Sequence, residues 1–104
     1  MKKRKLGKSD AEITEIGLGT WAIGGPWDFG WGPQSDQESL EAIEKALESG
    51  INWIDTAPAY GLGHSEEIVG QAIKSRRDTV FLATKCGLVW DASGKVTNNN
   101  KPES

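Results

Sequence analysis

Three side chains near the ends of two predicted strands are of types that could move a proton together. Asp55 ends the apolar run "INWID", Tyr60 follows five residues later, and Lys85 ends the apolar run "TVFLATK". In parallel α/β sheets, binding and catalytic groups sit at the carboxyl ends of the strands. If the two strands are neighbours, their backbones lie about 4.8 Å apart. An acid, an amine and a phenol would then converge on one point.

Such a group favours acid catalysis by the tyrosine. An ammonium group within about 4–6 Å makes a phenol easier to ionise, and a carboxylate keeps a partly buried ammonium charged and in place. The phenol could then donate a proton to a carbonyl oxygen that is becoming an alkoxide. Taken singly, each side chain is more often structural, because aspartate caps turns, lysine is usually solvated and a loop tyrosine commonly packs. Their expected meeting at one edge favours catalysis.

Three strands and two helices are predicted to position these groups. A small hairpin around the turn-rich "GKSDA" leads into a first strand at residues 14–18. Ser35 and Glu38 form a capping box that starts a helix, and Gly50 ends it. The strand "INWID", a second helix from near Ser65, and "TVFLATK" as a third buried strand follow. This alternation predicts a parallel α/β sheet, and the pattern alone allows an open doubly wound sheet or a barrel.

The segment 20–34 contains two prolines and three tryptophans without periodicity, and it predicts a long loop. Its aromatic content favours a functional loop over a disordered one. Two interpretations stay open for the loop tryptophans: they could form an apolar wall beside a substrate, or they could pack among themselves. These residues are Trp21, Trp27, Trp31 and Trp90.

The other conspicuous residues are expected to be structural. Trp53 lies inside a strand and is expected in the core. Cys86 follows Lys85 directly, but free cysteines are usually small buried apolar residues, and we expect the same here. Residues 86–104 are turn-rich and end in a Pro-Glu-Ser group of the kind that opens helices.

Composition excludes several classes of function. The 104 residues have the size of one domain, and 12 Lys and Arg against 15 Asp and Glu give a net charge of −3, so we expect no nucleic-acid partner. There is no apolar signal-peptide region and no run of about 20 apolar residues, so we expect no membrane association. A single cysteine allows no internal disulfide and suits the cytoplasm. One histidine and one cysteine cannot make a structural zinc site, and we expect no metal.

Three segments together resemble one known family. They are "GLGTW", "NWIDTAPAYGLGHSEEIVGQAI" and "FLATKCG", and in their order and spacing they are similar to the aldo-keto reductases. The resemblance implies a (β/α)8 TIM barrel and an NADP(H)-dependent reduction of aldehydes or ketones, with hydride passing from the nicotinamide to the carbonyl carbon. It also implies that Tyr60 is the proton donor, that Lys85 is its partner, and that Asp55 holds Lys85.

The resemblance further implies where the cofactor lies. Gly19, Thr20 and Trp21 match the family segment that meets the cofactor near its nicotinamide end. Asp55 is expected to contribute to the same part of the pocket.

One family feature is missing from the sequence. The family's fourth catalytic residue is a histidine after the fourth barrel strand, whereas His64 lies after the second and is expected to make only local hydrogen bonds. A complete barrel has eight strands and about 250 residues. Residues 1–104 are therefore expected to be the N-terminal segment of a single barrel domain, truncated after about three barrel strands and preceded by the small β-hairpin.

Two functional interpretations follow for such a segment. In the first, the complete protein is a carbonyl reductase and the isolated segment is nearly inactive. In the second, the protein is a non-enzymatic scaffold or channel-associated member of the same fold family, or the segment acts only in assembly. The unpaired edges of three parallel strands would favour self-association in either case.

Overall fold

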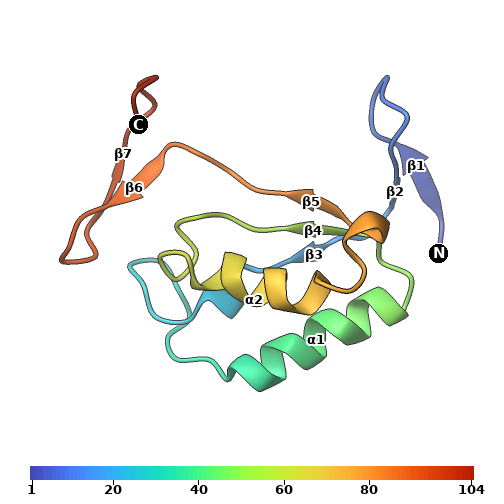
Figure 1. Cartoon of the computed structure of the whole chain (residues 1–104), viewed down its shortest axis with the longest axis horizontal. Helices are drawn as coiled ribbons and strands as arrows, with labels where there is room; N and C mark the ends of the chain where they lie inside the picture. The colour runs from blue at the N-terminus through green and yellow to red at the C-terminus, as the bar shows by residue number, and fades with distance from the viewer.

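A parallel three-stranded sheet lies at the centre of the fold, and the computed structural model describes residues 1–104 (Figure 1). Its strands are β3 (Leu18–Gly19), β4 (Trp53–Asp55) and β5 (Phe81–Ala83), paired in that order. Helices α1 (Asp36–Glu48) and α2 (His64–Ile73) connect consecutive strands and lie on the same face of the sheet (Figure 1). The predicted alternation of strands and helices is confirmed.

The ends of α1 follow from its sequence. The Ser35 hydroxyl accepts a hydrogen bond from the Glu38 amide at 3.3 Å, as the predicted cap requires. At the other end Gly50 has a φ of +103°, a conformation that glycine adopts without steric cost. Helix α2 begins one residue before the expected position, after Gly63. Neither helix has the length and apolar character that a membrane crossing requires.

The hydrophobic core lies between the sheet and the two helices. Ile54 of β4 is fully buried and packs with Ile43 of α1 and Ile68 of α2. The cluster is completed by Val69, Ile73 and Val80. Because side chains alternate across a strand, burial of Ile54 on the helix face turns its neighbours Trp53 and Asp55 to the opposite face.

Trp53 is half-buried and does not belong to this core, so the expectation of a core tryptophan is wrong. Its indole lies against the backbone of Gly17, where an added Cβ would be 2.1 Å from the ring. Its Nε1 donates a hydrogen bond to the Thr14 carbonyl at 2.9 Å. The tryptophan thus stays on the face opposite to Ile54 and the core, and Figure 1 shows that both helices lie on one face of the sheet.

The expectation that β5 is a buried strand is also wrong. All three of its residues are exposed, with Phe81 at 44% and Leu82 at 37%. The strand is apolar but lies at the edge of the sheet, and only β4 pairs with it. An apolar cavity of about 320 Å³ opens beside it, lined by Leu6, Ile13, Trp53, Phe81, Leu82 and Ala83.

The first barrel strand begins later than expected. Strand β1 (Lys3–Lys5) pairs antiparallel with β2 (Glu12–Thr14), and β3 starts only at Leu18. The backbone amide and carbonyl of Thr14 bond to side chains of Asn52 and Trp53, so they are not available for pairing with β4. The Thr14 amide donates to Asn52 Oδ1 at 2.8 Å, and its carbonyl accepts from Trp53.

The last segment forms a hairpin that the sequence did not predict. Strand β6 (Leu88–Trp90) pairs antiparallel with β7 (Val96–Asn98), and residues 101–104 form a turn rather than a helix. Asp91 organises the hairpin turn, because its Oδ1 accepts from the amides of Ser93 at 2.8 Å and Lys95 at 3.1 Å. The hydrogen bond from the Ser93 hydroxyl is the main reason why the pKa of the Asp91 carboxyl is lowered from its usual value. In Figure 1 this hairpin and the β1–β2 hairpin project from opposite ends of the sheet.

Candidate active site

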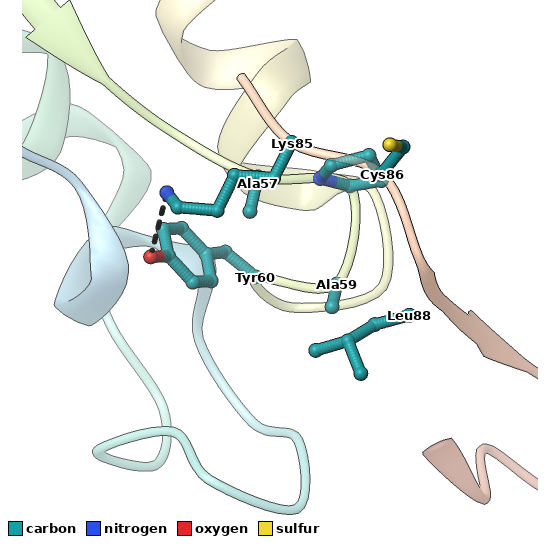
Figure 2. A pocket seen from close by; sticks show the side chains of 7 residues that line it. Ala57, Ala59, Tyr60, Lys85, Cys86 and Leu88 are labelled. Carbon is teal, nitrogen blue, oxygen red and sulfur yellow. Dashed lines mark hydrogen bonds between the residues drawn. The ribbon is translucent and has the colours of Figure 1, made fainter. Parts of the chain in front are cut away.

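Lys85 is the centre of the site that the sequence predicted. Its Nζ donates to Asp55 Oδ2 at 2.8 Å, to the Thr56 carbonyl at 2.9 Å and to the Tyr60 hydroxyl at 3.1 Å. Figure 2 shows the lysine side chain extended toward the phenol, with the dashed line marking their hydrogen bond. The structure therefore brings Asp55, Tyr60 and Lys85 together.

The surroundings of Lys85 favour its charged form. Partial burial alone would lower the pKa of Lys85, but the hydrogen bonds to Asp55 and Tyr60 and their charges outweigh burial and raise this pKa above 10.5. The lysine side chain is 46% exposed, so solvent still reaches it. Lys85 is consequently a cation at neutral pH.

Strand pairing explains why these groups meet. Asp55 is the register partner of Ala83, and the Thr56 amide donates to the Ala83 carbonyl at 2.9 Å, which extends the pairing past the end of β4. The chain leaving β5 then brings Lys85 alongside the chain leaving β4. This is the geometry expected at the carboxyl edge of a parallel sheet.

The loop that carries Tyr60 is held by two glycines in backbone contact. Gly24 ends the short 3-10 helix η1 (Trp21–Gly24), and an added Cβ there would lie 2.5 Å from the Tyr60 carbonyl carbon. Gly61 has a φ of +64°, and its added Cβ would lie only 1.7 Å from the Gly24 carbonyl oxygen. Any larger residue at either position would push the tyrosine loop away from η1.

The tryptophans take different roles. Trp27 packs on Tyr60 with ring centroids 5.9 Å apart, so it forms a wall beside the phenol. Trp21 and Trp31 pack edge to face on one another at 6.4 Å, and Trp90 lies on β6, 38% exposed. The structure thus shows loop tryptophans packed on aromatic neighbours, and an apolar wall beside a substrate stays a prediction.

A cavity of about 160 Å³ opens directly beside the phenol and the ammonium group. Figure 2 shows its lining, which consists of Ala57, Pro58, Ala59, Tyr60, Lys85, Cys86 and Leu88. The expectation that Cys86 is buried is wrong, because the chain leaving β5 is uncovered and the thiol is exposed. A small apolar cavity with one phenol and one cation fits a small organic molecule that carries a polar oxygen.

The segment predicted to meet a cofactor lies beside Asp55. Gly19 is the register partner of Asp55, and open space surrounds the place where its Cβ would be. Trp21 is 46% exposed at the start of η1. The side chain of Thr20 is fully buried instead, and its hydroxyl donates to the Asp55 carbonyl at 3.0 Å. Thr20 therefore holds the backbone of Asp55 from the buried side of the site.

His64 is held away from Lys85 by its own partners. Its Nε2 lies 2.6 Å from Asp36 Oδ1 at the start of α1, and its Nδ1 lies 3.8 Å from Glu67 Oε2. The histidine thus links the first turns of the two helices, as the sequence predicted for a local role. No group of three or more His, Cys, Asp and Glu side chains is arranged so that it could hold a metal ion.

Comparison with known proteins gives a consistent result. The family model described as the Aldo/keto reductase family matches residues 15–104. The chain is 52% identical over 92 residues to aldo-keto reductase YhdN of Bacillus subtilis, covering 86% of this chain and 27% of that protein. It is 48% identical over 101 residues to the NADH-specific methylglyoxal reductase of Escherichia coli, covering 94% of this chain and 30% of that protein.

Solved structures agree with these matches. The glycerol dehydrogenase of Gluconobacter oxydans superposes with a TM-score of 0.80 at 40% identity, covering 97% of this chain and 31% of that one. An aldo-keto reductase of Klebsiella pneumoniae, solved in complex with NADPH, superposes with a TM-score of 0.63 at 38% identity, covering 73% of this chain and 25% of that one. The chain therefore spans under a third of the length of each of these four proteins.

Proposed function

The chain belongs to the aldo/keto reductase family, and from this premise we propose that it forms the N-terminal part of a longer enzyme that reduces small aldehydes or ketones to alcohols. Residues 1–104 then supply the first three strands of one (β/α)8 barrel domain, and the catalytic histidine comes from outside them. The observation that carries the proposal is the single ammonium group of Lys85, which contacts both Asp55 and Tyr60 beside a small apolar cavity.

In the proposed mechanism Tyr60 is the proton donor. A carbonyl substrate in the cavity places its oxygen near the phenol, and Tyr60 transfers its proton as the oxygen becomes an alkoxide. Lys85 stabilises the phenolate that remains, and Asp55 keeps the ammonium group charged and aimed. Each of these groups acts within hydrogen-bonding distance of the next, at 3.1 Å and 2.8 Å.

A nicotinamide cofactor, NADP(H), supplies the hydride when bound. The residues present fit such a group, because Gly19 leaves open space at the end of β3 next to Asp55 and Trp21 exposes a flat indole beside it. Gly19, Trp21 and the Asp55 side chain would hold its nicotinamide end, with Thr20 fixing the backbone beneath. One relative is named as NADH-specific and another was solved with NADPH, so the two cofactors must be compared directly.

The proposed partners are therefore a small carbonyl compound and the cofactor, with no nucleic acid or membrane involved, and the proposed location is the cytoplasm. The alternative is a non-enzymatic member of the family that uses its exposed sheet edge for assembly. The exposed apolar residues of β5 are the observation that favours it.

Replacing Tyr60 by Phe in the complete protein tests the proposal. The ring and its packing on Trp27 remain while the proton donor is lost, so kcat for carbonyl reduction should fall by about 100-fold or more. Oxidation of NADPH and of NADH with a small aldehyde gives the measurement. Phe29→Tyr, in the exposed loop, serves as a control for solvent-accessible phenols. Turnover that survives Tyr60→Phe contradicts the mechanism and favours the non-enzymatic alternative.

A further inference from the structure

Three hydroxyl groups form a buried chain beneath the site. Thr20 follows β3, Thr56 follows β4 and Ser65 lies in the first turn of α2, and their residues are 0%, 1% and 0% exposed. The Ser65 Oγ lies 2.9 Å from both Thr20 Oγ1 and Thr56 Oγ1. The Thr20 hydroxyl in turn lies 3.0 Å from the Asp55 carbonyl oxygen. This chain of hydroxyls thus joins the ends of β3 and β4 to the first turn of α2.

The hydrogens of these hydroxyls can be arranged in one direction. With the Thr20 hydroxyl donating to the Asp55 carbonyl, it accepts from the Ser65 hydroxyl, which in turn accepts from the Thr56 hydroxyl. The Ser65 hydroxyl also lies 3.2 Å from the Thr20 carbonyl oxygen, and the Asp55 carbonyl also accepts from the Thr20 amide at 3.0 Å, so backbone groups share in the same network.

Ser65 also holds the loop of the phenol. Its amide donates to the Tyr60 carbonyl at 3.1 Å, while its hydroxyl is the middle member of the chain. Thr56, at the start of the chain, offers its carbonyl to Lys85 Nζ at 2.9 Å. One serine therefore connects the backbones that carry Asp55, Thr56 and Tyr60, which are the three residues that accept hydrogen bonds from Lys85.

We propose that Ser65 is a positioning residue that sets the separation of Tyr60, Asp55 and Lys85 through this directed chain of buried hydroxyls. The proposal rests on the proposed function only where it concerns turnover. Loss of the Ser65 hydroxyl leaves Thr56 without an acceptor and Thr20 without a donor, in a place that water does not reach. The ends of β3 and β4 and the tyrosine loop then lose their common fixed point.

The test uses the complete protein with four substitutions. Ser65→Ala removes the central hydroxyl, and Thr56→Val removes the first one while keeping the shape of the side chain. We expect kcat to fall about tenfold in each, the loss of about one hydrogen bond. Thr56→Ser, unlike Thr56→Val, keeps a hydroxyl at this position and should retain most of kcat. Ser49→Ala, which removes a serine hydrogen bond at the far end of α1, is the matched control.

A second measurement does not depend on turnover. Titration of the Lys85 side chain by NMR should show its pKa falling toward 10.5 in Ser65→Ala and Thr56→Val, because contacts to Asp55 and Tyr60 loosen. Recovery in Thr56→Ser supports the chain. An unchanged Lys85 titration in both variants overturns the proposal, whatever happens to kcat. If the unsubstituted protein reduces no carbonyl compound, the proposed function fails while this titration still decides the role of Ser65.

Discussion

Lys85 uses all of its hydrogens inside the protein. An ammonium group has three hydrogens, and the contacts to Asp55, Thr56 and Tyr60 take one each. None is left for a substrate, so Lys85 can influence a reacting carbonyl only through the phenol.

The raised pKa of Lys85 makes part of the stability depend on pH. A group whose pKa is higher in the folded state stabilises the fold fully below its unfolded value of 10.5, and this contribution is lost as the pH rises through the folded value. We expect the difference in unfolding free energy between the unsubstituted protein and Lys85→Met to be constant near pH 8. It should shrink above pH 10.5. Urea unfolding across this range gives the measurement.

Asp55→Asn serves as the partner substitution for this experiment. Without the carboxylate, the main contact that raises the pKa of Lys85 is removed. In the Asp55→Asn background, the effect of Lys85→Met on the unfolding free energy should therefore change less above pH 10.5. A difference that is the same at pH 8 and pH 12 with Asp55 intact would contradict the assignment of the shift to these contacts.

The sequence predicted the meeting of Asp55, Tyr60 and Lys85, but it did not predict the hydroxyl residues beneath them. Asp55 and Lys85 were predictable because Asp55 ends β4 and Lys85 follows the end of β5 by two residues, and strand ends meet at one edge of a parallel sheet. Ser65 and Thr20 gave no such signal. Small hydroxyl residues are common at helix starts and turns, and nothing in the spacing of 45 residues between them indicates a contact.

The contact between η1 and the tyrosine loop depends on glycine at two positions. Gly61→Ala should destabilise the fold by about 2 kcal/mol or more, because the left-handed backbone and the clash with Gly24 add together. Gly70→Ala is the matched control. Its position in α2 is open, so alanine should stabilise the helix by about 0.5–1 kcal/mol. Thermal unfolding of both variants gives the measurement, and equal effects would contradict this account.

Among the elements, helices were predicted better than strands. The Ser35 cap and the Gly50 end are local signals, which fix α1 without knowledge of its surroundings. The start of β3 and the exposure of β5 depend on partners far away in the chain. Asn52 and Trp53 take the hydrogen bonds of Thr14, and only β4 lies beside β5. The β6–β7 hairpin was missed although Ser93-Gly94 is a turn dipeptide, because each of its strands has only three residues and gives little periodic signal.

At the scale of the whole molecule, one face of the sheet carries no helix and both edge strands, β3 and β5, have a single partner. Phe81 and Leu82 expose apolar side chains at an unpaired strand, which is the situation that promotes association. The isolated 104-residue chain should therefore self-associate, and it should not reduce carbonyl compounds measurably. Sedimentation and a turnover assay give the two measurements. A monomeric, active 104-residue chain would contradict both expectations.

A substitution at the β5 edge should affect the isolated chain and the complete barrel differently. Phe81→Lys should shift the isolated chain toward monomer, whereas in the complete barrel the same lysine would be buried without a partner and should destabilise the fold by about 3 kcal/mol or more. Phe29→Lys, in the exposed loop, should have neither effect.

The proposed chemistry is compact in sequence as well as in space. The largest separation among the contacts of Lys85 is the 30 residues between Asp55 and Lys85. Contacts this local close small loops at little entropic cost, so they can form early when a chain folds. At about 5–20 residues per second, a ribosome synthesises the segment from Asp55 to Lys85 within a few seconds. The proton-handling centre could thus assemble on the nascent polypeptide ahead of any segment that comes later.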